Sequence, residues 1–117
     1  MNVEEFREYC IAKKGVSEEL PFGPDTLVYK VVGKIFALTG LDNEVFTVNL
    51  KCNPDRAIEL REEFNYILPG FHMSKIHWNT VNAEFCPTKL MKELIDHSYD
   101  LVLSSLTKKQ KEAFDLF

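Results

Sequence analysis

The chain has 117 residues, of which 45% are hydrophobic and 27% charged, and its 14 basic and 18 acidic residues give a formal net charge of −4. These proportions are typical of a folded globular protein and exclude a disordered chain, and the length predicts a single domain over residues 1–117 with one core. The acidic balance argues against indiscriminate binding to nucleic acid or to anionic membranes, because both need a basic surface.

The first quarter of the chain predicts one helix followed by a rigid turn. Val3, Phe6 and Cys10 recur at helical spacing, so residues 3–14 should form a helix with one buried side. Two prolines bracket a glycine within residues 20–25, which is typical of a stiff turn. This turn separates the helix from the strands that follow.

Residues 26–51 predict three strands, at 26–32, 35–39 and 45–51, with Gly33-Lys34 as a two-residue turn between the first two. The alternation of residues assigns one face to the core: Leu27, Tyr29, Val31, Phe36, Leu38, Phe46, Val48 and Leu50. The opposite, open face carries Thr26, Val28, Lys30, Val32, Ile35, Ala37, Thr39, Thr47, Asn49 and Lys51. This open face is half apolar, so we expect it to bind a ligand, to pair with another protein or copy, or to lie under a terminal segment.

The second half of the chain predicts three helices and one or two strands. Asn as N-cap followed by Pro starts a helix over about 53–66. A short strand is considered at 71–73, and a clearer one is expected at 76–81. Pro87 opens a long helix with an apolar stripe, and the capping-box pattern at Thr107 starts a final short helix.

The order of elements gives the fold class. It reads α-β-β-β-α-β(β)-α-α, and strands that are joined by hairpins form an antiparallel sheet. We therefore predict an α+β two-layer sandwich, in which a sheet of four or five strands is packed by helices.

Charge is unevenly distributed along the chain. Residues 26–51 carry three lysines against two acidic residues, and residues 67–92 carry three lysines against one. The strand-bearing segments are therefore mildly basic, while the helical segments carry the net negative charge. Local binding of an anion by the strand layer remains open, and such contact should be weak and sensitive to salt.

Targeting and cysteine signals indicate a cytoplasmic protein. The N-terminus is acidic and is not a signal peptide, and no apolar run is long enough to span a bilayer, so we expect no membrane partner. The chain has three cysteines, an odd number, and they are far apart: Cys10, Cys52 and Cys86. This argues against disulfide bonds and against a zinc site.

No catalytic constellation is recognisable, so the sequence predicts no enzyme, no cofactor and no metal. The phosphate-binding glycine motifs are absent, and the carboxylates lie mainly on outward helix faces. The histidines His72, His77 and His97 have no further ligands at metal spacing. Ser98 lies in a helix stripe without a nucleophile turn, so we interpret it as a packing residue bonded to the preceding helical turn.

The most informative stretch is residues 69–78, which hold the only Trp, two His, a Lys, a Phe and a Met. One interpretation is a recognition surface, with aromatic faces for stacking and cationic groups for phosphate or carboxylate. The other is structural, with Met73 and Trp78 closing the core and the polar residues at a strand end. The residues alone leave both open.

Several motifs, in order along nearly the whole chain, resemble the MmcQ/YjbR family. They are Pro21-Phe22-Gly23, Gly33-Lys34-Ile35-Phe36-Ala37, Leu50-Lys51, Pro69-Gly70-Phe71-His72-Met73, Lys75, His77-Trp78, Leu94-Ile95, Ser98-Tyr99 and Leu101-Val102. The resemblance implies a small bacterial domain with a fold like that of secretion chaperones. It also implies a DNA-binding role of a double-wing kind, and it brings no catalytic residues.

The resemblance marks a set of candidate binding residues: Lys34, Lys51, His72, Lys75, His77 and Trp78. In a DNA-binding domain the lysines would contact phosphate, and the other three would contact base or sugar. The alternative is a protein-binding or chaperone-like module that associates through its open sheet face, with another protein or with itself.

Overall fold

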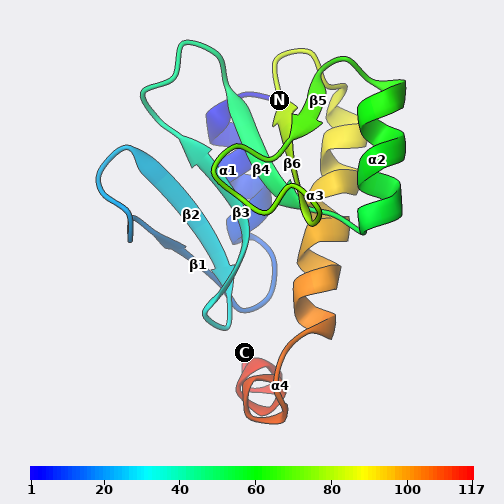
Figure 1. The fold of residues 1–117 in the computed structure, drawn as a ribbon. Coiled ribbons are helices and arrows are strands. Elements are labelled where there is room, and N and C mark those ends of the chain that lie inside the picture. Colours follow the sequence, from blue (N-terminus) through cyan, green and yellow to red (C-terminus); the bar gives the residue numbers. More distant parts are fainter.

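The computed structural model describes residues 1–117 and shows one sheet with helices packed against it (Figure 1). The helices are α1 (Val3–Ile11), α2 (Pro54–Glu63), α3 (Thr88–Ser104) and α4 (Lys108–Asp115). The strands are β1 (Val16–Glu19), β2 (Thr26–Val31), β3 (Lys34–Gly40), β4 (Thr47–Lys51), β5 (Ile67–Pro69) and β6 (Trp78–Asn82). None of the helices has the length and apolar character that crossing a bilayer would require.

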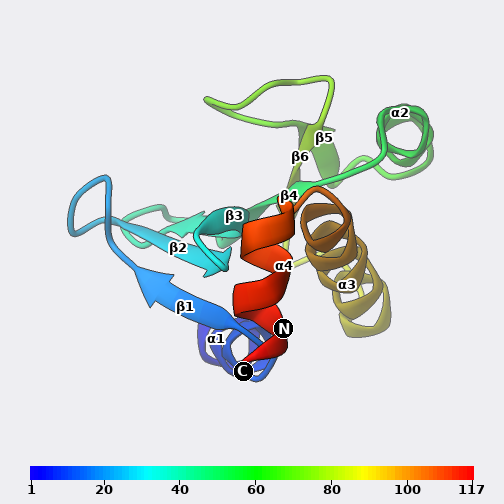
Figure 2. The same ribbon diagram turned by 90° about the horizontal axis from the view of Figure 1, so that it is seen from below.

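All pairings in the sheet are antiparallel, in the order β1-β2-β3-β4-β6-β5. Seen from below in Figure 2, α1, α3 and α4 lie on one side of the sheet. The long loop between β5 and β6 lies on the opposite side, and α2 lies beside these two strands. The predicted α+β fold is confirmed, with six strands in place of four or five.

The predicted helix starts are confirmed by their capping contacts. The Asn53 side chain accepts from the backbone N–H groups at the start of α2, whose first residue is Pro54. Thr107 and Gln110 form the predicted capping box of α4. These contacts are local, which explains why the sequence shows them.

The strand β1 was not predicted. It forms an edge of the sheet, pairing only with β2, and its sequence Val-Ser-Glu-Glu lacks an apolar alternation. The helix before it ends at Ile11, earlier than the predicted residue 14. Charged residues on an edge strand discourage pairing with other chains, and Glu18 and Glu19 also form ion pairs with Arg7 and Lys30.

The hairpin between β2 and β3 is shifted by one residue from the prediction. Its turn is Val32-Gly33, with φ of 46° and 81°, so Val31 lies opposite Lys34. A β-bulge follows, because Tyr29 lies opposite Ala37 while Lys30 lies opposite Ile35.

The bulge changes which residues of β3 face the core. Phe36 and Ala37 are both fully buried, and Thr39 is buried as well. Leu38, which was predicted in the core, instead lies on the open face opposite Asn49. The predicted core face is otherwise correct, since Tyr29, Phe46 and their neighbours on β2 and β4 pack in or against the core.

Ser98 of α3 bonds the bulged residue Phe36. Its buried hydroxyl donates to the Phe36 carbonyl at 2.5 Å and accepts the Lys51 N–H at 2.8 Å. A side chain from the helix layer therefore joins β3 to β4 where the strand ladder opens. The predicted bond to the preceding helical turn is wrong, because Ser98 instead bonds two strands distant in sequence.

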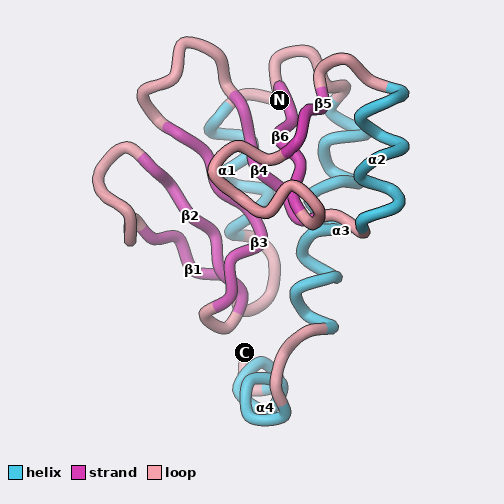
Figure 3. The backbone as a smooth tube through the Cα atoms, viewed as in Figure 1, coloured by secondary structure: helices cyan, strands magenta, loops and turns pink.

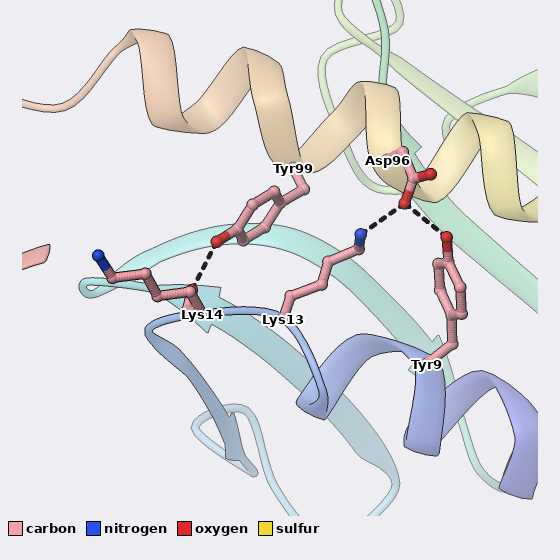
Figure 4. Close-up of polar contacts among 5 residues, drawn as sticks. All are labelled: Tyr9, Lys13, Lys14, Asp96 and Tyr99. Carbon is pink, nitrogen blue, oxygen red and sulfur yellow. Dashed lines mark hydrogen bonds and ion pairs between the residues drawn. The ribbon is translucent and has the colours of Figure 1, made fainter. Parts of the chain in front are cut away.

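Polar contacts fix α1 and the segment just after it against α3 (Figure 4). Tyr9 and Lys13 both donate to Asp96 Oδ1, at 2.8 Å and 2.5 Å, and the Tyr99 hydroxyl donates to the Lys14 carbonyl at 2.5 Å. Burial and the Asp96 carboxylate raise the pKa of Tyr9 to about 12. Tyr9 is therefore a protonated donor at any physiological pH.

Candidate functional site

The loop of residues 70–77, which we call the crossing loop, runs from β5 to β6 over the open face of the sheet (Figure 3). The Gly70 N–H donates to the Trp78 carbonyl at 2.9 Å, which closes the loop at its base. A Cβ atom at Gly70 would lie only 2.8 Å from the Trp78 Cβ atom. Glycine is therefore required for this close approach.

Side chains from the sheet and from α2 hold the crossing loop in place. The Phe71 N–H donates to Thr80 Oγ1 at 2.9 Å, and Asn49 Nδ2 donates to the Phe71 carbonyl at 3.2 Å. The Arg61 guanidinium donates to Asn79 Oδ1 at 2.6 Å and to the carbonyls of Lys75 and Trp78. The short strand considered at 71–73 is therefore wrong, because these residues belong to the anchored loop.

A cleft of about 540 Å³ lies between the start of the crossing loop and the open face of the sheet. Its walls come from the 20–25 turn, the 40–45 loop and strands β2 to β4. The lining residues are Phe22, Asp25, Thr26, Leu38, Thr39, Gly40, Asp42, Asn43, Thr47, Asn49, Phe71, His72 and Met73. Leu38 reaches this cleft only because the bulge in β3 turns it to the open face.

The lining combines aromatic and acidic groups. The Phe22 residue is 66% exposed and Phe71 is 54% exposed, although both are large apolar residues. Asp25 and Asp42 bring negative charge, and no lysine or arginine lines the cleft. His72 adopts a left-handed backbone with φ of 58°, a strained conformation of the kind found at binding sites.

The predicted site residues divide into three places. His72 lines the cleft, as described above. Lys51 and Trp78 lie opposite each other on β4 and β6, and the His77 carbonyl accepts the Cys52 N–H at 2.8 Å. Arg61 donates to the carbonyls of both Lys75 and Trp78, and the Lys75 ammonium donates to the Gly70 carbonyl at 3.3 Å. We call Lys51, Arg61, Lys75 and His77 the basic corner.

Lys34 lies away from these residues, at the helix side of the sheet. Its ammonium donates to the Ser105 carbonyl at 2.8 Å, at the C-terminal end of α3. A cation at this end of a helix stabilises the exposed carbonyl groups. The structure thus gives Lys34 a structural contact and separates it from the other candidates.

Sequence reasoning missed the acidic side of the cleft. Asp25 and Asp42 lie in two loops whose only signal was turn composition, and Asn43 lies beside the second. The 20–25 turn, the 40–45 loop and the crossing loop come together only when the sheet is assembled. Their spacing along the chain therefore gives no sign of a site.

Other reactive groups are not gathered into a site. No three His, Cys, Asp or Glu side chains are placed to hold a metal ion. The three cysteines are free and buried, and burial raises the pKa of Cys10 to about 12 and that of Cys86 to about 11. Their thiols are therefore poor nucleophiles in the folded protein.

Comparison with known proteins places this chain in a family. The family model described as YjbR matches residues 11–101. The uncharacterised protein YbdF of Escherichia coli O157:H7 is 37% identical over 93 residues, which cover 79% of this chain and 76% of YbdF. The uncharacterised protein YjbR of Escherichia coli K12 is 27% identical over 113 residues, which cover 96% of each chain.

Solved structures show the same architecture. The Deinococcus radiodurans protein DR2400, described by the domain DUF419, matches with a TM-score of 0.89 and 33% identity, covering 97% of this chain and 88% of that one. A Pseudomonas syringae protein matches with a TM-score of 0.75 and 28% identity, covering 86% of this chain and 98% of that one. Because the family model spans more than three quarters of the sequence, the chain belongs to the YjbR family.

Proposed function

We propose that the protein is a non-enzymatic binding domain that holds its ligand in the cleft beneath the crossing loop. The observation that carries this proposal is the cleft itself, a walled space of about 540 Å³. Ligand sites in proteins are typically about 300–1,000 Å³ in volume and combine apolar walls with a few polar groups. The cleft has both properties.

The chemistry of the lining supports binding rather than catalysis. Asp25, Asp42 and His72 are its titratable residues, and no cysteine or serine lines it. Nucleophilic catalysis needs an activated nucleophile within hydrogen-bond reach of a base. The lining also holds threonine hydroxyls and carboxylates, but none of them is hydrogen-bonded to His72, so no nucleophile is paired with a base.

The structure changes how the protein could associate with a partner through the open sheet face, which was the alternative prediction from the sequence. That prediction depended on Val28, Val32 and Ile35, yet Val28 is fully buried and the other two are half-buried. A bare apolar face is therefore not presented. A ligand or a partner segment would enter the cleft that the crossing loop forms over this face.

The test is a fragment screen by NMR with ¹⁵N-labelled protein. Uncharged aromatic and amide fragments should shift the amide signals of Leu38 and of Phe71 to Met73. Leu38→Trp should narrow the cleft and weaken these shifts, while Leu68→Trp, at an open-face position outside the cleft lining, should retain them in full. Fragments that bind both variants alike, or that shift no cleft signal, would contradict the proposal.

Nucleic-acid binding is a second candidate, and the basic corner favours it. Lys51 lies opposite Trp78 in the sheet, and Arg61 donates to the carbonyls of Lys75 and Trp78, while the cleft is acidic. A few cations support only weak contact, because each phosphate contact adds about one unit to the salt slope. This binding would use a surface separate from the cleft.

Fluorescence anisotropy with a labelled DNA duplex tests this second candidate. Binding should be seen at low salt and should weaken severalfold in Lys51→Glu and Lys75→Glu. The control is Lys89→Glu, an exposed lysine in the first turn of α3. The absence of binding at low salt, or equal weakening in the control, would end this candidate.

A further inference from the structure

The charge and the walls of the cleft indicate what kind of ligand it selects. We propose that the cleft binds an organic cation, which carries a guanidinium or ammonium group on a short apolar stem. This inference rests on the binding function proposed above. Phosphate and other anions would then not be ligands of the cleft.

The two carboxylates of the cleft have no cationic partner. Asp25 and Asp42 both line it, and the three ion pairs of the molecule lie elsewhere, joining Arg7 to Glu18, Lys13 to Asp96 and Lys30 to Glu19. No lysine or arginine of the chain reaches the cleft. A cationic ligand would supply the missing positive charge, whereas an anion would be repelled from both carboxylates.

The aromatic residues suit the same ligand. Phe22 comes from the 20–25 turn and Phe71 from the crossing loop, and both remain largely exposed. The face of an aromatic ring attracts an ammonium or guanidinium group. Leu38 and Met73 add apolar surface that the stem of such a ligand would cover.

Apart from His72, the remaining polar residues of the lining are threonines and asparagines, whose hydroxyl and amide oxygens can accept hydrogen bonds. Thr26, Thr47 and Asn43 line the cleft beside the carboxylates. Asn43 lies directly over Gly40, since a Cβ atom at Gly40 would be 2.5 Å from the Asn43 Nδ2 atom. A guanidinium group has five donors and no acceptor, so a wall of carboxylate, hydroxyl and amide oxygens matches its hydrogen bonding.

The experiment compares two compounds of equal size that differ in charge. Nα-acetyl-arginine methylamide and Nα-acetyl-citrulline methylamide are titrated separately into ¹⁵N-labelled protein at low salt. The arginine compound should shift the amide signals of Leu38, Asn43 and Phe71 and should bind about fivefold more tightly than the citrulline compound, as expected for about 1 kcal/mol from exposed ion pairs.

Matched variants test whether the two carboxylates are responsible. The double variant Asp25→Asn, Asp42→Asn should bind the arginine compound no more tightly than the citrulline compound. Both substitutions are at exposed positions and are nearly equal in size, so the fold should be retained. The control Glu44→Gln, an exposed acid of the same loop that does not line the cleft, should leave the fivefold preference unchanged.

A further titration distinguishes the source of the cation. Butylguanidinium carries the guanidinium without peptide groups, and acetylated, amidated Gly-Arg-Gly carries it on a chain with the same single charge. Equal or tighter binding of butylguanidinium would indicate a free organic cation as ligand, and tighter binding of the tripeptide would indicate a protein segment. Both results support a cationic ligand in the cleft.

Two results would overturn the inference, and they separate it from the proposed function. If the arginine and citrulline compounds bind the cleft equally, the cation preference is wrong, although uncharged fragments can still bind there. If neither compound nor any fragment shifts the cleft signals, the inference and the proposed function both fail.

Discussion

At the scale of single residues, a few side chains define the sheet and the loop that covers it. Ser98 is fully buried in α3, yet its hydroxyl bonds β3 and β4. His97, the preceding residue, accepts the Asn53 N–H at the start of α2 through its Nε2 atom at 3.1 Å. These two neighbours therefore connect the longest helix to the sheet and to another helix.

Replacing Ser98 by alanine should destabilise the protein by about 2 kcal/mol. The substitution leaves the buried Phe36 carbonyl and the Lys51 N–H without their partner, and an unsatisfied buried polar group costs about 1–3 kcal/mol. Urea unfolding measures the loss. The control is Ser104→Ala, an exposed serine that bonds only within its own helix, and a comparable loss there would contradict this account.

His97 should make stability fall as the pH is lowered below about 6.5, the ordinary pKa of histidine. Partial burial first, and then Arg56, lower the pKa of His97 in the folded protein, while Asp100 opposes them. Between the folded and unfolded pKa values the unfolded chain binds more protons, so acid favours unfolding there, and protonation also removes the acceptor for Asn53.

The measurement is the urea midpoint at pH 7.5 and pH 5.5. The decrease between the two should be smaller in His97→Gln, which keeps a neutral acceptor, than in the wild type. His72→Gln, at an exposed loop position, should keep the full decrease. An unchanged decrease in His97→Gln would show that another group is responsible.

At the scale of elements, prediction from sequence succeeded where the signal is local. The start of α2 and the capping box of α4 were predicted to the residue, because each depends on side chains within one helical turn. The strand β1 was missed because its exposed, acidic sequence has no apolar alternation. The bulge at Phe36 was missed because its partner Ser98 lies 62 residues away.

The position of the crossing loop depends on the close approach of Gly70 to Trp78. A Cβ atom there would lie 2.8 Å from the Trp78 Cβ and 3.0 Å from the Trp78 carbonyl oxygen. Gly70→Ala should therefore displace the base of the loop and cost about 1–3 kcal/mol, as for overpacking in a core.

Urea unfolding and the amide spectrum check this prediction together. Signals of Phe71 to Met73 should move in Gly70→Ala, since these residues follow the displaced base. Ser74→Ala, at an exposed position in the same loop whose hydrogen bonds use only its backbone, should change neither stability nor these signals. A Gly70→Ala protein of wild-type stability would refute the argument from close approach.

At the scale of the whole molecule, the sequence predicted the α+β layers and the family, and only part of the candidate site. Residues 69–78 were singled out from composition, and their first part lines the cleft. Lys34 was grouped with them, yet its ammonium bonds the C-terminal end of α3, and that helix lies on the opposite side of the sheet from the crossing loop (Figure 2). The acidic side of the cleft was not predicted, because it forms only when three loops meet.

The buried thiols report on the integrity of the whole fold. Cys10, Cys52 and Cys86 are buried and free, and burial raises the pKa of each. A thiol reagent such as DTNB at pH 8 should react slowly with the folded protein and rapidly with three thiols in urea. Rapid reaction of one thiol without denaturant would show that the molecule opens locally.

The most direct test of the central claim is one amide shift map recorded with two ligands. The same ¹⁵N-labelled protein is titrated first with a cleft-binding fragment or the arginine compound, and then with a DNA duplex. The account predicts shifts at Leu38, Asn43 and Phe71 with the small ligand, and shifts confined to the basic corner with DNA. A map in which small ligands leave these cleft signals unmoved, while DNA shifts Leu38, Asn43 and Phe71, would contradict it.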